Sequence, residues 1–209
     1  MQTFSRKRSR KTALIPLFGA LVLLTVASVQ AQQQMLPALD QRLAPLRDRF
    51  NQDAGKVRLI VIVDPTCPPC RWGASEIQKQ VLATIPSNRL AVYVVWIPVL
   101  NFQDEATLQR NGLKESSRIS DSRAIHYIDP NGFSGKQYSA VMNVPYHAPA
   151  WDMYFAFGSD VRWEDRAPTP TEWMYQGEGF DRAHLLDGHK FAEQIQKLLA
   201  TAGSKATKR

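Results

Sequence analysis

The fold of this chain is decided by residues 57–70, which read VRLIVIVDPTCPPC. The first seven residues are, with one exception, aliphatic, and such a run predicts a strand buried on both faces of a parallel or mixed sheet. Residues 64–66 form a turn pattern, and residues 71–85 have the apolar spacing of a helix. The only cysteines of the sequence, Cys67 and Cys70, therefore fall between a buried strand and a helix.

The spacing of the two cysteines predicts a redox centre. Thiols at positions i and i+3 of the first helical turn lie on one face and can close a disulfide. The unpaired N–H groups and the dipole of a helix N-terminus stabilise a thiolate, and can lower a cysteine pKa from about 8.5 to roughly 3.5–7.5. Pro68 and Pro69 are compatible with this position, because the first helical turn needs no N–H from them.

The rest of the chain predicts an alternation of helices and strands. A strand over residues 89–100 follows the helix over 71–85, which implies a right-handed crossover between parallel strands. The other expected elements are a helix over 38–51 that Pro45 interrupts, a helix from Asp104 to Arg110 that Gly112 ends, a strand over 124–128, a helix over 133–142, an aromatic strand over 150–157, a second β segment over 161–164 or 172–176, and a final helix from Asp187 to Ala202. We expect residues 101–147 to be an insertion over the sheet.

The charge of the chain is concentrated at its N-terminus. Five of the 26 basic residues precede residue 12, and the remaining 21 face 19 acidic residues, so the folded part is close to neutral. A nucleic-acid partner is therefore not expected.

Residues 1–31 have the pattern of a signal peptide. A basic segment precedes an uncharged apolar run from Ala13 to Val29, and Val29-Gln30-Ala31 offers small residues for cleavage. The run has 17 residues, at the short limit of a membrane span, so a retained N-terminal anchor is the alternative. In both cases we expect residues 32–202 to form a domain in the periplasm or another exported space, where disulfides persist, followed by a flexible basic tail at 203–209.

This order of elements resembles the thioredoxin superfamily over roughly residues 38–202. The motif Cys67-Pro68-Pro69-Cys70 is most similar to exported, often membrane-tethered thiol–disulfide oxidoreductases. The resemblance implies an α/β fold with a central mixed sheet flanked by helices. It implies Cys67 as the attacking thiol, Cys70 as the resolving thiol and a cis-proline facing them, for which Pro149 matches best because it precedes an apolar strand. Protein thiols or disulfides would be the substrates and a membrane protein an electron donor, with no bound cofactor.

The sequence departs from the family pattern beside the cysteines. Thr66 stands where a tryptophan is usual, and the strand before the motif lacks the usual buried acid, since Val61 and its neighbours are apolar. Asp64 is then the expected proton acceptor for Cys70, unless it is only a turn residue. Asp152 is either a buried acid near the site or a solvent-facing strand residue.

Other interpretations of the cysteine pair stay open. A structural disulfide explains the spacing poorly, because so short a loop gains little entropy from cross-linking. Thiolates suit Cu(I), so a copper-binding chaperone using Cys67, Cys70 and His147 is an alternative, with His126 as another ligand. A non-catalytic thioredoxin-like interaction module is the third. Arg71 could stabilise a thiolate, and Trp72, Trp151, Trp163 and Trp173 could rim a docking surface.

Overall fold

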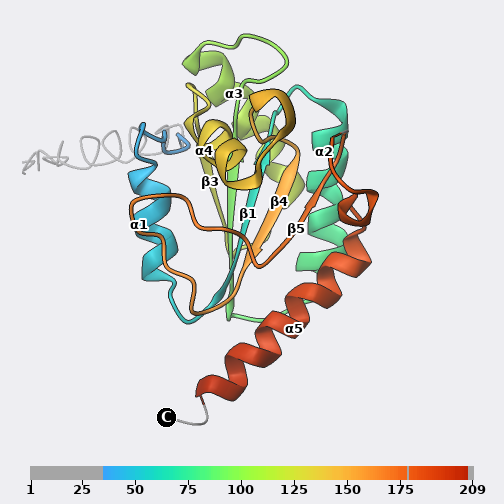
Figure 1. Ribbon diagram of the computed structural model, residues 1–209. Helices are drawn as coiled ribbons and strands as arrows, with labels where there is room; N and C mark the ends of the chain where they lie inside the picture. The colour runs from blue at the N-terminus through green and yellow to red at the C-terminus, as the bar shows by residue number, and fades with distance from the viewer. Residues whose placement is uncertain (1–34, 178, 207–209) are drawn as a thin grey trace, which may run out of the picture. The chain divides into compact units, whose positions relative to one another are not determined.

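The computed structural model describes residues 35–177 and 179–206, and these form a mixed sheet with helices on both faces (Figure 1). The strands are β1 (Val57–Val63), β2 (Leu90–Trp96), β3 (Ala124–Ile128), β4 (Met153–Phe157) and β5 (Glu172–Tyr175), in the order β3-β2-β1-β4-β5. The pairs β1–β2 and β2–β3 are parallel, whereas β4 is antiparallel to both β1 and β5. The predicted fold class, a thioredoxin-like α/β fold around a central mixed sheet, is confirmed.

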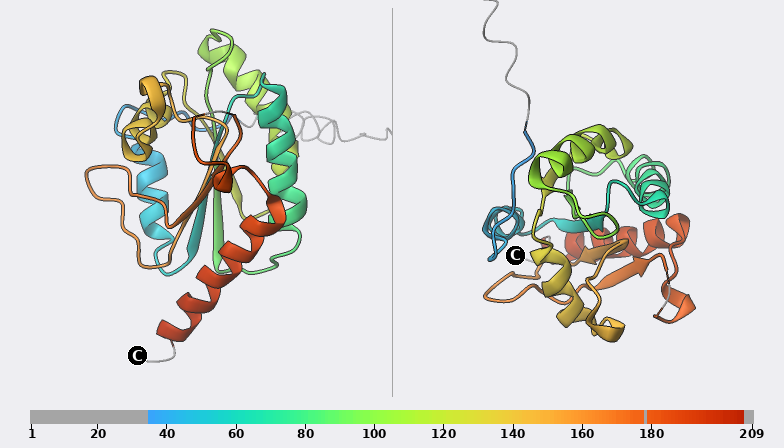
Figure 2. Two further views of the ribbon diagram at one scale, coloured as in Figure 1. Left: turned by 45° about the vertical axis from the view of Figure 1, so that its right-hand side comes forward. Right: turned by 90° about the horizontal axis from the view of Figure 1, so that it is seen from above.

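The helices divide between the two faces of the sheet (Figure 2). They are α1 (Ala44–Gln52), α2 (Pro68–Glu76) with its π-helical continuation η1 (Ile77–Leu82), α3 (Glu105–Glu115) with the 3-10 turn η2 (Ser116–Ile119), α4 (Phe133–Met142) and α5 (Gly188–Ala206), besides the short turns η3 (Pro145–His147) and η4 (Arg182–His184). Side chains of α2, η1, α3, η2 and α5 share one hydrophobic core, and those of α1 and α4 share the other.

The strand β1 is the centre of the sheet because its side chains enter both cores. Val61 and Val63 point into the core under α2, whereas Ile60 and Ile62 point into the core under α1. All seven residues of β1 are buried, as its aliphatic sequence predicts. The end of this strand, and with it the cysteine motif, is therefore held by packing on two sides.

The expected insertion over residues 101–147 completes the sheet. It contains α3, η2 and α4, and its strand β3 pairs with β2 at the sheet edge. Gly112 does not end α3 but lies buried inside it, where a side chain would meet Leu36 and Trp96 at 3.2 Å. The need for close packing on Trp96 outweighs the low helix propensity of glycine.

Several element boundaries differ from the sequence-based prediction. Pro45 does not interrupt a helix but lies in the first turn of α1, where its missing N–H costs nothing. The strand β4 begins at Met153, not at Ala150, because Tyr146, His147 and Asp152 have positive φ angles that turn the chain before it. Of the two β segments proposed after it, the later one is β5, and α5 continues past Ala202 to Ala206.

The expected signal peptide, residues 1–31, lies outside the described residues, as do residues 207–209 of the expected tail. Among the helices that the structure does describe, none has both the length and the apolar character to cross a membrane.

Asp53, after α1, is expected to make the fold acid-sensitive. Burial alone would raise its pKa, but hydrogen bonds from Lys56, Arg49 and Tyr93 outweigh burial and lower the pKa from 3.8 to about 2. The ionised carboxylate thus contributes about 2 kcal/mol of stability above pH 3.8, which is lost as the pH falls through about 2. In urea unfolding, Asp53→Asn should be less stable than wild type near neutral pH, and the gap should close as the pH falls below 2. A stability gap that stays the same at neutral pH and below pH 2 would contradict this.

Candidate active site

Cys67 and Cys70 lie at the start of α2, as the sequence predicts. Cys67 is the N-cap residue, and its Sγ accepts a hydrogen bond from the backbone N–H of Cys70 at 3.3 Å. Both thiols are free, with exposed fractions of only 1% for Cys67 and 0% for Cys70. The pair is therefore a buried dithiol between the end of β1 and the first turn of α2.

Asp152 is the acid that faces this dithiol. A carboxylate oxygen of Asp152 and the two sulfurs all lie within 4.8 Å of one another, and Asp152 is 3% exposed. The residue directly precedes β4, whose Met153 pairs with Ile62 of β1, so the antiparallel pairing brings it beside the end of β1. Its φ of +54° lies in the left-handed region, which aspartate and asparagine tolerate better than most residues.

Tyr154 and Gln176 hold Asp152 in place. The Tyr154 hydroxyl donates to Oδ1 of Asp152 at 2.6 Å, and Nε2 of Gln176 donates to the same oxygen at 2.8 Å. The Gln176 amide also reaches the Tyr154 hydroxyl at 3.0 Å and the carbonyl of Pro69, inside the cysteine motif, at 3.1 Å. This network ties the carboxylate just before β4 to the first turn of α2, which carries the thiols. Neither Tyr154 nor Gln176 was predicted from the sequence as a site residue.

Burial sets the protonation of the site. Burial raises the pKa of the Cys70 thiol far above its ordinary value, and nearby Asp152 raises it further. Burial also raises the pKa of Cys67, although hydrogen bonding from Cys70 opposes the shift. The low thiol pKa that a helix N-terminus can produce is therefore not found here, because desolvation outweighs the helix terminus. Burial likewise raises the pKa of Asp152, against the hydrogen bonds of Tyr154, Gln176 and Cys70.

The carboxylate of Asp64 is engaged elsewhere. One oxygen accepts hydrogen bonds from the backbone N–H and the hydroxyl of Thr66, both at 2.7 Å. The other accepts the backbone N–H groups of Val99 at 2.7 Å and Leu100 at 2.8 Å. Asp64 thus fixes the turn before the motif and the loop after β2. The geometry assigns it the role of a turn residue and leaves Asp152 as the acid grouped with both sulfurs.

Pro149 does not provide the expected cis-proline. No peptide bond among the described residues is cis, so the Ala148–Pro149 bond is trans. The turns needed before β4 come instead from residues with positive φ, including Asp152. Pro149 packs near Gly135 and lines a hollow with Val99. The position beside the thiols, where the resemblance would place the proline, is occupied by Asp152.

Neither histidine expected as a copper ligand belongs to the donor group of the dithiol. His147 is exposed on η3, and it is not part of a group of close metal-binding side chains. His126 stacks on Trp96, with ring centroids 6.1 Å apart, and bonds to the carbonyl of Ile119. Within the described part of the chain, the donor group that could hold a metal is Cys67, Cys70 and Asp152.

The other residues considered beside the motif separate into different environments. Arg71 places Nε 3.2 Å from a Glu115 carboxylate oxygen, which directs it away from a role at the thiols. Trp72 is 53% exposed, whereas Trp163 is buried in the core under α1. Trp173 stacks on His184. Of the expected tryptophan surface, Trp72 is the member that stands well exposed beside the cysteines.

Gly73 is expected to be required for the contact between α2 and the Asp152 network. A methyl group at this position would lie 1.9 Å from the Tyr154 hydroxyl and 2.2 Å from Nε2 of Gln176. Replacing glycine by alanine inside a helix normally raises the free energy of unfolding by about 0.5–1 kcal/mol. Here we expect Gly73→Ala to destabilise by about 1–3 kcal/mol in chemical denaturation. The double variant Gly73→Ala/Tyr154→Phe should recover part of the lost free energy of unfolding. If the effects of the two substitutions on the free energy of unfolding simply added, the contact would be contradicted.

Comparisons with known proteins find distant structural similarity alone. No family model and no curated protein matches the chain. Among solved structures, it is similar to a thioredoxin-like protein in the oxidised form, at 14% identity and a TM-score of 0.43 over 70% of this chain and 79% of that one. A secreted Mycobacterium tuberculosis disulfide oxidoreductase homologous to E. coli DsbE has 14% identity and a TM-score of 0.42, over 70% and 84% of the two chains. A Chlorobium tepidum protein described as a thiol:disulfide interchange protein DsbE has the same identity and TM-score, over 73% and 84%.

The class that the chain itself defines is a thioredoxin-like protein with a Cys-x-x-Cys motif. The strand order and the position of the motif at the start of α2 carry this assignment. The likeness predicted from the sequence is therefore confirmed at the level of the fold.

Proposed function

We propose that this protein is a thiol–disulfide oxidoreductase that exchanges disulfides with protein substrates through Cys67 and Cys70. The observation that supports this best is the grouping of both free thiols with the buried carboxylate of Asp152 within 4.8 Å. A structural disulfide needs no acid beside it, whereas dithiol exchange needs a group that takes and returns a proton.

The proposed reaction begins at Cys67. Its thiolate attacks one sulfur of a partner disulfide, which forms a mixed disulfide and releases the other partner sulfur as a thiolate. Cys70 then loses its proton to the Asp152 carboxylate, and the Cys70 thiolate attacks the Cys67 sulfur. The mixed disulfide breaks, the Cys67–Cys70 disulfide forms and the partner leaves as a dithiol after taking up two protons. Two electrons pass from this protein to its partner.

The burial of the thiols favours this direction. A dithiol is a strong oxidant when its reduced form is stabilised, which a low thiol pKa achieves. Here burial raises the pKa of both Cys67 and Cys70, so the thiolate is not stabilised. We propose a reductant of protein disulfides, with its own disulfide reduced in turn by a separate dithiol donor, for which a membrane protein is the natural source in an exported space.

Reduction of a model protein disulfide tests the proposed activity. In the presence of excess dithiothreitol, the wild-type protein should accelerate reduction of insulin disulfides, and Cys67→Ala should fall to the uncatalysed rate. Circular dichroism and thermal unfolding of the variant would show that it is folded. Full activity of a folded Cys67→Ala variant would end the proposal.

We further propose that the protein works in an exported space. The support is the sequence pattern of residues 1–31. Cell fractionation with N-terminal sequencing tests this. If the signal is cleaved, we expect a mature chain that begins at Gln32 outside the cytoplasm. If it is retained as an anchor, we expect a chain that begins at Met1 in the membrane fraction. Protein found in the cytoplasm would contradict export.

Metal binding is the second candidate function, because the two thiols and the Asp152 carboxylate form a compact donor group. Thiolates accept Cu(I) and zinc, and a carboxylate suits zinc better than copper. Competition titrations with Cu(I) and Zn²⁺ distinguish it from the first candidate. Stoichiometric binding that is lost in Asp152→Asn, together with no exchange activity, would favour this candidate.

A further inference from the structure

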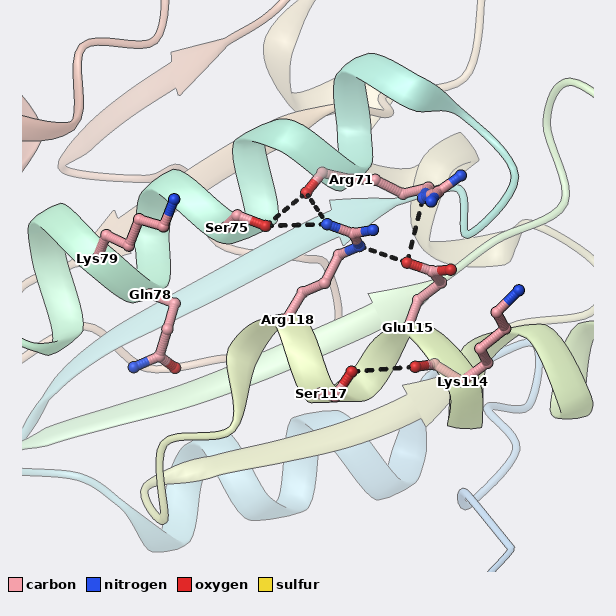
Figure 3. Close-up of a pocket in the computed structure, with 8 residues that line it drawn as sticks. All are labelled: Arg71, Ser75, Gln78, Lys79, Lys114, Glu115, Ser117 and Arg118. Atoms are coloured by element: carbon pink, nitrogen blue, oxygen red, sulfur yellow. Dashed lines mark hydrogen bonds and ion pairs between the residues drawn. The ribbon is translucent and has the colours of Figure 1, made fainter.

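A cationic groove runs along α2 from Pro68 of the cysteine motif, and Figure 3 shows the residues that line its larger hollow. A hollow of about 400 Å³ is lined by Pro68 and Trp72, and an adjoining hollow of about 630 Å³ lies between α2 with η1 and the end of α3 with η2. The two hollows share Arg71, Ser75, Lys79 and Arg118, so they form one continuous surface. This surface, the α2 groove, begins at the motif itself.

The α2 groove has an excess of positive charge. Its charged lining residues are four cations, Arg71, Lys79, Lys114 and Arg118, and one carboxylate, Glu115. That carboxylate is buried and already contacts two of the cations, since Arg71 lies 3.2 Å from it and Arg118 bonds to it directly. Lys79 and Lys114 are exposed, and within the described residues no ion-pair or hydrogen-bond partner exists for either ammonium group. Three positive charges are thus left unbalanced.

The groove is rigid in its middle and open at its two lysines. Arg118 is held by the carbonyl of Arg71 at 3.4 Å and by the hydroxyl of Ser75 at 3.1 Å, which locks η2 against α2. Figure 3 shows Lys79 and Lys114 extending from the two different helices that form the walls. Such a fixed arrangement of positive charge fits an extended anionic chain better than a single small anion.

The position of Trp72 connects this surface to the redox chemistry. The side chain is 53% exposed at the end of the groove nearest Pro68. Exposed tryptophan and arginine are the residues most enriched in the energetic centres of protein interfaces. A chain bound in the groove and in contact with Trp72 would therefore arrive beside Cys67.

We propose that the α2 groove binds an acidic segment of the redox partner protein and so selects the disulfide presented to Cys67. The inference rests on the proposed function, because it assigns the groove to a partner in thiol–disulfide exchange. Charge complementarity of this kind raises the rate of association and makes it fall with ionic strength. The groove therefore determines which protein is reduced, while the dithiol performs the reduction.

Binding is tested first, without redox chemistry. The probe is a fluorescent peptide rich in Asp and Glu that lacks cysteine, compared by anisotropy with a Ser/Gly peptide of equal length. We expect the acidic peptide to bind at low salt and to lose about tenfold in affinity in the double variant Lys79→Glu/Lys114→Glu. The matched control, Lys190→Glu/Lys197→Glu on α5, changes the charge equally and should bind as wild type does.

Reduction is tested second, with disulfide peptides that carry either the acidic or the neutral sequence. The ratio of kcat/KM for the acidic over the neutral peptide should exceed one, and should fall about tenfold in the groove variant or at high salt.

Three outcomes would contradict the account. If the groove variant and wild type had the same kcat/KM ratio and the same affinity for the acidic peptide, the groove proposal would be overturned and the exchange activity would stand. Binding without reduction of either peptide would contradict the proposed function instead. Binding to anionic lipid vesicles, with no binding to the acidic peptide, would also overturn the groove proposal.

Discussion

Replacing Cys70 with serine is expected to trap the partner protein on Cys67 as a mixed disulfide. The attack of Cys67 does not require the Cys70 thiol, but the release of the partner does, because Cys70 supplies the second sulfur. A complex that survives denaturing, non-reducing electrophoresis and disappears on reduction should accumulate, and turnover should fall to the uncatalysed rate. Serine differs from cysteine in one atom, so the buried position under Tyr154 and Asp152 should stay packed.

The reciprocal variant is the control. Cys67→Ser removes the attacking thiol and should form no complex and no product. If Cys67→Ser, and not Cys70→Ser, accumulated the mixed disulfide, the roles of the two cysteines would be reversed. Mass spectrometry of the trapped complex would identify the linked sulfur directly, and the proposed order requires it to be Cys67.

Asp152→Asn is expected to slow exchange and to stabilise the fold at the same time. Without the carboxylate, Cys70 has no positioned proton acceptor, and loss of such a group typically costs on the order of 100-fold in rate. Asparagine keeps the shape, accepts from Tyr154 and Gln176, and tolerates the positive φ at this position. Single-turnover kinetics should place the loss in the release of the mixed disulfide and not in its formation.

The stability gain of Asp152→Asn follows from the direction of the pKa shift. Burial raises the pKa of Asp152 above 3.8, so the folded state holds its proton more tightly than the unfolded state. The stabilisation of the folded state by this bound proton is fully present below pH 3.8. It is lost as the pH rises through the pKa of Asp152 in the folded state, above which the buried carboxylate is charged. The variant should therefore be more stable than wild type in urea unfolding at neutral pH and match it in acid.

A second variant separates proton transfer from simple packing. The Tyr154 hydroxyl bonds to the Asp152 carboxylate and lowers the pKa of Asp152. Tyr154→Phe should thus raise that pKa and move the pH profile of mixed-disulfide release to higher pH, without abolishing release. A destabilised Asp152→Asn variant that releases the mixed disulfide at the wild-type rate would show that Asp152 is structural.

The sequence predicted the scaffold of this site well. The aliphatic run of β1 determines a central strand, and the prolines after Cys67 are compatible with a helix start, so the place of the dithiol follows from local pattern. The edge strand β3 and the helix α4 were also predictable from alternation and turn residues. Such features depend on periodicity within a few residues, which the sequence contains directly.

The acid of the site was not predictable in the same way. Asp64 and Asp152 are both near apolar strands, and only the pairing of β4 with β1 brings Asp152 beside the sulfurs. Gln176 joins them from the residue after β5, through a contact that depends on the missing side chain of Gly73. Asp152 and Tyr154 are two residues apart at the start of the aromatic segment, and this spacing is the sequence pattern that could have indicated the network. The expectation of a lowered thiol pKa was wrong, because the burial of the two thiols depends on the packing of the whole fold.

The equilibrium redox potential of Cys67 and Cys70 tests the central claim most directly. The purified domain would be titrated against glutathione and dithiothreitol buffers, with the thiol state read by alkylation and mass spectrometry. A redox-active dithiol predicts a potential between roughly −120 and −270 mV, and the burial of both thiols predicts a value near the reducing end of that range. A potential well below about −300 mV, with no exchange of protein disulfides, would identify a structural disulfide and contradict the account.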